Sequence, residues 1–138
     1  STLQERALAR AQLTDFLHPE QFPDWPERYR EQLSFKGFRR ARLSDWRENT
    51  GGDQTPELAA VGRNPRPVLV IWGKQDQTIA FKNSAALLAA MPRAQFLPVD
   101  SAGHLPIWEQ PSIVQPALLA FLKRTAARDS ETTLSKGE

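Results

Sequence analysis

Apolar residues recur at helical spacing through the first third of the chain, which predicts three amphipathic helices. The first covers residues 2–17 and ends at His18, because a residue before proline is pushed out of helical backbone angles. The second covers residues 25–34, with Asp24 as its expected N-cap and Pro26 in its first turn. Gly37 separates it from the third, over residues 38–46.

From residue 66 onward the pattern is that of a parallel βαβ unit. Residues 68–72 are apolar without alternation, which is typical of a strand buried on both faces. A crossover helix over residues 81–91 ends at Pro92. The second strand, residues 95–100, contains Pro98, which cannot donate a ladder hydrogen bond and therefore favours an edge position. We expect a right-handed βαβ unit at the rim of a sheet.

A last helix begins at Pro111 or Ser112, and Pro116 predicts that its start is irregular or delayed. The polar residues after it have little to bury, which predicts a mobile tail. A short helix over residues 56–61 and a loop over residues 62–67 precede the first strand. The chain is thus expected to divide into a helical segment (1–62), a βαβα segment (63–125) and a tail (126–138).

The amino-acid composition excludes several classes of protein but does not identify one. The chain has 138 residues, 40% of them hydrophobic and 25% charged, as expected of one folded domain. The absence of cysteine excludes disulfides, thiolate zinc sites and cysteine nucleophiles, and is compatible with the cytoplasm. A net charge of +2 and the lack of any long apolar run indicate neither a nucleic-acid nor a membrane partner. The basic residues Lys36, Arg39, Arg40 and Arg42 invite comparison with a nucleic-acid or phosphate site, but charge on the outer face of an amphipathic helix is the commoner explanation, and we expect that here.

Asp76 and His104 each follow one of the two predicted strands. Ligands of open α/β sheets bind at the carboxyl ends of strands, so the two side chains are expected to meet if the strands are neighbours. A carboxylate bonded to one ring nitrogen fixes the imidazole tautomer and leaves the other nitrogen to accept a proton. Taken alone each signal is weak, since Asp76 also suits an ordinary Asx-turn. The pair predicts the acid and base of a catalytic site.

At these residues the sequence resembles the α/β-hydrolase family. The likeness lies in residues 72–79, around Asp76, and in residues 102–111, around His104. Residues 22–46 resemble the helical lid that some members insert before those strands. The resemblance implies a C-terminal part of the α/β-hydrolase fold, with Asp76 as the triad acid, His104 as the general base and residues 1–62 as a lid or cap. Ala80, where many members have proline, and Pro116 depart from the family pattern.

The nucleophile that the resemblance implies is absent from this sequence. Its serine would lie in a Gly-x-Ser-x-Gly elbow between a strand and a helix, upstream of the acid. None of the eight serines fits; Ser101 comes nearest, but it lies only three residues before His104. Two strands would also leave an open sheet edge. Since the chain begins at Ser1 without methionine, we expect a missing N-terminal half of the same protein to complete the sheet and the site.

The leading hypothesis is a hydrolase of a small ester or related acyl compound, without metal or cofactor. Trp25, Tyr29 and Phe38 of the lid, and Leu105 beside His104, are the candidate walls of the substrate pocket. One alternative is a non-catalytic α/β module that binds a partner through its sheet edge. Another keeps the fold but uses an upstream aspartate nucleophile, as in a dehalogenase or epoxide hydrolase. Homo-oligomerisation is left open.

Overall fold

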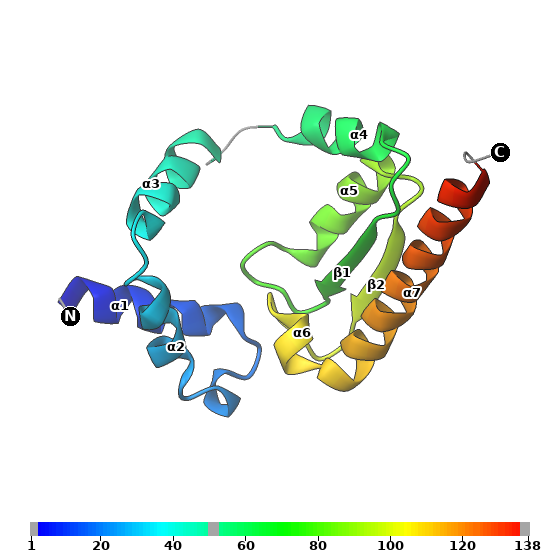
Figure 1. Cartoon of the computed structure of the whole chain (residues 1–138). Coiled ribbons are helices and arrows are strands. Elements are labelled where there is room, and N and C mark those ends of the chain that lie inside the picture. Colours follow the sequence, from blue (N-terminus) through cyan, green and yellow to red (C-terminus); the bar gives the residue numbers. More distant parts are fainter. Residues whose placement is uncertain (1–2, 50–52, 136–138) are drawn as a thin grey trace.

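The computed structural model describes residues 3–49 and 53–135, without the side chains of residues 46, 49 and 128–135. Figure 1 shows two groups of elements: helices α1, α2 and α3 lie to one side, and a βαβ unit with its covering helices lies to the other. The first group contains the helices expected over residues 2–46, and the second contains the expected sheet. None of the described helices is both long enough and apolar enough to cross a membrane.

The N-terminal group differs from the sequence prediction in its first two helices. α1 (Leu3–Ala11) ends early, and the tighter 3₁₀ helices η1 (Gln12–Asp15) and η2 (Pro19–Gln21) follow before α2 (Trp25–Gln32). Asp24 does not cap α2, because it has helical backbone angles and its carboxylate instead accepts from Arg28 Nε at 2.7 Å. Gly37, at φ +90°, turns the chain into α3 (Phe38–Asn49), as its freedom of conformation allows.

The predicted boundary at residue 62 does not coincide with a change of packing partner. Helix α4 (Thr55–Arg63), which that boundary groups with the lid, packs against α5 (Ser84–Ala90) beside the sheet. A Cβ atom on Gly62 would overlap the carbonyl oxygen of Ala90, so glycine is what permits the close approach. α4 therefore belongs structurally to the βαβ unit.

The sheet consists of β1 (Leu69–Gly73) and β2 (Gln95–Val99), which are parallel as predicted. The crossover between them contains η3 (Phe81–Asn83) and α5, and the sheet lies between α5 and α7 in Figure 1. Pro98 lies opposite Trp72 and is exposed, in agreement with an edge position for β2. In the described part of the chain β1 has no second neighbouring strand, and Leu69, Val70, Ile71 and Trp72 are only partly buried.

Two helices follow β2: α6 (Pro106–Glu109) and α7 (Pro111–Ser135). The predicted irregular or delayed start of the last helix is wrong, since α7 begins at Pro111 and contains Pro116 in its second turn. It also continues to Ser135, through most of the segment predicted to be a mobile tail. Val99, Ala102 and Val114 form a buried cluster, with Ile71 and Leu97 packed against it. The cluster thus joins the sheet to α7.

Candidate functional site

Asp76 lies in a tight turn after β1 and is almost inaccessible, with a side chain 3% exposed. Its Oδ1 atom accepts hydrogen bonds from the backbone N–H groups of Thr78 and Ile79, both at 2.9 Å. The Ile79 carbonyl in turn accepts a hydrogen bond from Trp72 Nε1 at 3.1 Å. This is an Asx-turn in which one carboxylate oxygen fixes the backbone. The second oxygen remains for another partner.

Backbone contacts join the turn after β1 to the end of β2. The Lys74 N–H donates to the Val99 carbonyl at 2.9 Å, and the Gln75 N–H donates to the Ala102 carbonyl at 3.0 Å. A Cβ atom on Gly73 would overlap the Ala102 carbonyl, so only glycine permits the two turns to lie this close. The separation between the two turns is therefore set by the backbone.

His104 follows β2 at the end of residues 100–104, here called the histidine turn, in which the chain turns at Asp100 and Ser101. Ser101 has left-handed backbone angles, with φ 53°, and is exposed. No helix directly follows it, as a nucleophile elbow would require, since α6 begins only at Pro106. The His104 N–H donates to the Asp15 carbonyl at 2.7 Å, which ties the histidine turn to the N-terminal segment.

The two side chains meet as the sequence predicts. His104 Nδ1 lies 2.9 Å from Asp76 Oδ2, and the histidine side chain is 32% exposed. An ionised carboxylate can only accept hydrogen bonds, so the proton of this bond lies on Nδ1. Nε2 is then the basic nitrogen, on a partly exposed ring whose orientation a buried carboxylate fixes. Such an arrangement can accept a proton at Nε2 while Asp76 stabilises the imidazolium formed.

A cavity of about 420 Å³ lies beside this pair. Asp76 and His104 form one end of its lining, and the length of β1 forms a wall. Its other lining residues are Ile79 and Leu87. The cavity therefore follows the side of the molecule where β1 is exposed, and it brings the site and the strand into a single concave surface.

The four residues predicted to line a substrate pocket do not line this cavity. Trp25 packs edge-on against Trp108 of α6, with ring centroids 5.2 Å apart. Tyr29 packs edge-on against Phe38 at 6.2 Å, and its hydroxyl is buried without a hydrogen-bond partner among the described residues. Leu105 is partly buried beside His104. In the described chain these side chains pack within the helical layer or next to it.

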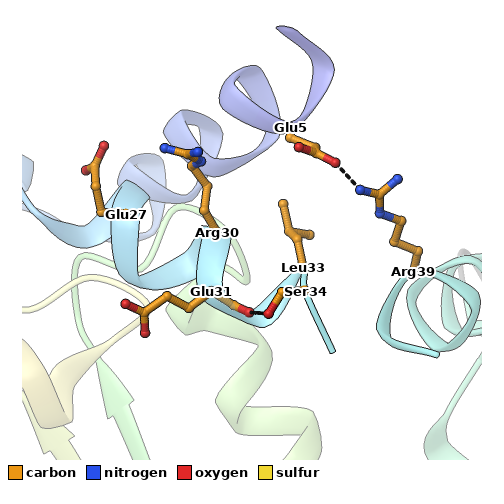
Figure 2. Close-up of a pocket in the computed structure, with 7 residues that line it drawn as sticks. All are labelled: Glu5, Glu27, Arg30, Glu31, Leu33, Ser34 and Arg39. Carbon is orange, nitrogen blue, oxygen red and sulfur yellow. Dashed lines mark hydrogen bonds and ion pairs between the residues drawn. The ribbon is translucent and has the colours of Figure 1, made fainter. Parts of the chain in front are cut away.

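A second pocket, of about 550 Å³, lies among the N-terminal helices (Figure 2). Charged residues dominate its lining, and an ion pair joins Glu5 of α1 to Arg39 of α3 across it. Its other lining residues are Glu27, Arg30, Glu31, Leu33 and Ser34. Neither turn of the candidate site contributes to it. The basic residues of the sequence cluster, Lys36, Arg39, Arg40 and Arg42, are exposed, as the outer-face interpretation predicts.

Sequence reasoning missed two carboxylates beside the site: that of Glu109 contacts the turn before His104, and that of Asp15 contacts the turn that contains Asp76. Glu109 Oε2 accepts the Gly103 N–H at 2.7 Å, and its Oε1 accepts the Leu17 N–H at 2.6 Å. Asp15 Oδ1 accepts the Thr78 hydroxyl at 2.8 Å. Glu109 lies inside the recognised motif at residues 102–111, but its partner Leu17 is 92 residues away. Nothing in the sequence could have indicated that pairing.

No protein-family model matches the sequence, whereas several solved structures match the fold. A 2-hydroxy-6-oxo-6-phenylhexa-2,4-dienoate hydrolase from Rhodococcus sp. strain RHA1 aligns with a TM-score of 0.63 and 23% identity, over 86% of this chain and 43% of that one. A thermophilic esterase from Thermogutta terrifontis aligns with a TM-score of 0.63 and 19% identity, over 91% and 52%. A bacterial membrane phospholipase A aligns with a TM-score of 0.61 and 19% identity, over 88% and 39%.

The chain therefore spans about half the length, or less, of the enzymes it resembles. At these identities the likeness establishes the fold. Its two-stranded parallel sheet, with helices on either side, corresponds to a part of theirs. The chain has the fold of part of an α/β-hydrolase.

Proposed function

We propose that this chain supplies the acid and the general base of an α/β-fold hydrolase that cleaves a small ester or related acyl compound. The observation that carries the proposal is the 2.9 Å contact between His104 Nδ1 and Asp76 Oδ2 at the carboxyl ends of two adjacent parallel strands. The solved structures with the same fold are described as a hydrolase, an esterase and a phospholipase. That agreement supports the reaction class and not a particular substrate.

In the proposed mechanism His104 Nε2 takes the proton of a nucleophilic hydroxyl as that oxygen attacks the acyl carbon. Asp76 holds the Nδ1 proton and stabilises the positive charge on the ring. The proton on Nε2 then passes to the leaving alkoxide, and a water molecule completes the cycle in the same way. No metal or cofactor takes part in this mechanism.

We propose that the nucleophile belongs to polypeptide outside these 138 residues, which pairs with the free edge of β1. Three observations support this: no serine lies in a nucleophile-elbow motif, β1 has only β2 as a neighbour in the described part, and the matched enzymes are about twice as long. Helices α1 to α3 would form the lid. Trp25, Tyr29, Phe38 and Leu105 would reach the substrate only through a rearrangement of that lid. A cytoplasmic location fits the cysteine-free composition.

The test uses the complete protein that contains these residues and p-nitrophenyl esters of short acids. His104→Ala should lower kcat at least about 10³-fold, because the general base is lost. His18→Ala is the matched control, since His18 is exposed and its side chain pairs with Glu20, away from both turns. Equal kcat values for His104→Ala and the wild type would refute the assignment of His104.

The nucleophile is located separately, with a fluorophosphonate that modifies activated serines. Peptide mapping should find the adduct on a serine outside the 138 residues. An adduct on Ser101 would overturn the proposal for the nucleophile. If no adduct forms but a haloalkane or epoxide is hydrolysed, the protein is instead a member with an aspartate nucleophile. A protein that turns over none of these compounds would favour the non-catalytic binding module.

A further inference from the structure

The carboxylate of Glu109 joins two segments that are far apart in the sequence. Oε1 accepts the N–H of Leu17, which lies between η1 and η2, and Oε2 accepts the N–H of Gly103, directly before His104. The two distances, 2.6 and 2.7 Å, are at the short end for charge-assisted hydrogen bonds. Both donors are backbone N–H groups, so this bridge fixes the backbone of the two segments relative to each other.

The segment bridged by Glu109, residues 15–17, also contacts both turns of the catalytic pair. The Asp15 carbonyl accepts the N–H of His104 at 2.7 Å, and Asp15 Oδ1 accepts the hydroxyl of Thr78 at 2.8 Å. Thr78 is one of the residues whose N–H fixes the Asp76 carboxylate. A Cβ on Gly103 would approach the Asp15 carbonyl and the Leu17 nitrogen to 2.8 Å. Residues 15–17 therefore pack directly on the histidine turn.

An aromatic cluster anchors the same segment to the N-terminal helices. Phe16 is 5% exposed and stacks on Phe22 with ring centroids 4.2 Å apart. It also meets Trp25 of α2 edge-on at 5.0 Å, and Trp25 meets Trp108, the residue before Glu109, at 5.2 Å. Aromatic pairs in these geometries stabilise the cluster beyond the area that they bury, although Trp108 itself is 47% exposed. The position of α2 is thereby coupled to the position of α6 and of Glu109.

We propose that Glu109 is a positioning residue that holds His104 in line with Asp76 and transmits the placement of the N-terminal helices to the catalytic pair. This inference rests on the proposed function for its effect on turnover. With the bridge intact, the backbone at residues 103 and 104 is fixed by Glu109 on one side and by Asp15 on the other. Without it, only the Asp15 carbonyl holds the turn against residues 15–17, and the imidazole can move relative to Asp76.

Three variants of the complete protein test the proposal: Glu109→Ala, Glu109→Gln and the control Glu57→Ala. Alanine removes both hydrogen bonds. Glutamine keeps the shape and one acceptor oxygen, but its NH₂ group faces the second N–H donor. Glu57 is an exposed carboxylate in the first turn of α4, away from both turns. It therefore controls for the loss of one negative charge.

The first readout is turnover of the p-nitrophenyl ester. A misplacement of about 1 Å can lower a rate about 10²-fold, so we expect kcat to fall about 10²-fold in Glu109→Ala and about tenfold in Glu109→Gln, with KM changed less than about threefold. Glu57→Ala should match the wild type. Loss of thermal stability alone, with kcat unchanged below the unfolding temperature, would overturn the proposal and leave the proposed function intact.

The second readout does not depend on turnover. The proton of His104 Nδ1 in a hydrogen bond to a carboxylate gives a downfield NMR resonance, which His104→Ala identifies by its disappearance. We expect this signal to broaden or vanish in Glu109→Gln and Glu109→Ala and to persist in Glu57→Ala. A signal unchanged in both Glu109 variants would refute the positioning role. If no ester is hydrolysed even by the wild type, the proposed function fails, while this signal still decides the role of Glu109. Should Glu109→Ala not fold, Glu109→Gln decides both readouts.

Discussion

The substitution Asp76→Asn should separate the two roles of this side chain, which are to hold the turn after β1 and to fix the tautomer of His104. The amide oxygen can still accept the N–H groups of Thr78 and Ile79, which the carboxylate accepts at 2.9 Å, so the turn should keep its shape. The NH₂ group then replaces Oδ2 and can only donate to His104 Nδ1. The ring proton must therefore move to Nε2, and the histidine loses the basic nitrogen that would activate a nucleophile.

The magnitudes of the two effects should differ widely. A change of tautomer in a triad of this kind lowers kcat about 10⁴-fold, which corresponds to about 5 kcal/mol of transition-state stabilisation. The free energy of unfolding should fall by only about 1–2 kcal/mol, because a charge-assisted hydrogen bond is replaced by a neutral one and the backbone bonds remain. Asp76→Ala should lower both quantities more, since it also removes the acceptor of the partly buried bonds from the N–H groups of Thr78 and Ile79.

The assay is kcat for a p-nitrophenyl ester in the complete protein, measured beside urea unfolding of the same samples. Asp100→Asn is the matched control: its side chain is 73% exposed and its carboxylate pairs with Lys74 at 2.8 Å. The control should leave kcat unchanged. If Asp76→Asn retains kcat within about tenfold of the wild type, the acid does not set the tautomer and the reasoning from the 2.9 Å contact is refuted.

Three further predictions concern the backbone around the site and the helix before it. Gly103→Ala should lower the free energy of unfolding by about 1–3 kcal/mol in urea titrations and lower kcat, because its Cβ would lie 2.8 Å from backbone atoms of residues 15 and 17. Ser101→Gly should raise the free energy of unfolding by up to about 1 kcal/mol, since φ 53° suits glycine, and should keep full turnover if Ser101 is not the nucleophile. The hydroxyl and the N–H of Thr55 lower the pKa of the Asp53 carboxyl below its usual value of 3.8. Because the pKa is lowered in the folded state, ionised Asp53 stabilises the start of α4 above pH 3.8, and this contribution is lost as the pH falls through the folded-state pKa. Acid titrations followed by circular dichroism should show the loss in the wild type and not in Asp53→Ala.

The elements around Asp76 and His104 were predictable from local sequence alone. An uninterrupted apolar run identifies the first strand, and Pro98 predicts the edge position of the second, because a proline lacks the N–H that a central strand needs. The meeting of Asp76 with His104 then follows from the parallel order of the strands. The sequence allows Asp76 to form either an Asx-turn or a contact with His104. In the structure Oδ1 accepts the N–H of the Asx-turn and Oδ2 contacts His104.

What the sequence could not predict depends on contacts between distant segments. Asp24 suits an N-cap by type, but its carboxylate pairs with Arg28 one turn later. Pro116 suggested an irregular start, yet α7 accommodates it near the helix N-terminus. The bridge from Glu109 to Leu17 exists only because residues 15–17 pack on the histidine turn. No local pattern carries that information.

The exposed edge of β1 leads to a last prediction that joins folding to the site. Hydrogen bonds from Gln95 N–H to the Val68 carbonyl and from Lys74 N–H to the Val99 carbonyl, both at 2.9 Å, fix which backbone groups face β2. By the alternation of a parallel ladder, the N–H groups of residues 70 and 72 face β2, and those of residues 69, 71 and 73 face the free edge.

In the 138-residue chain the amides of residues 69, 71 and 73 should therefore exchange with deuterium much faster than those of residues 70 and 72. In the complete protein a neighbouring strand should protect both sets, and because it would end beside Gly73 it would lie next to Asp76 and His104. The same added strand would then cover the edge of β1 and complete the site. Equal protection of both sets in the 138-residue chain would contradict this, since the edge would already be covered without any added polypeptide.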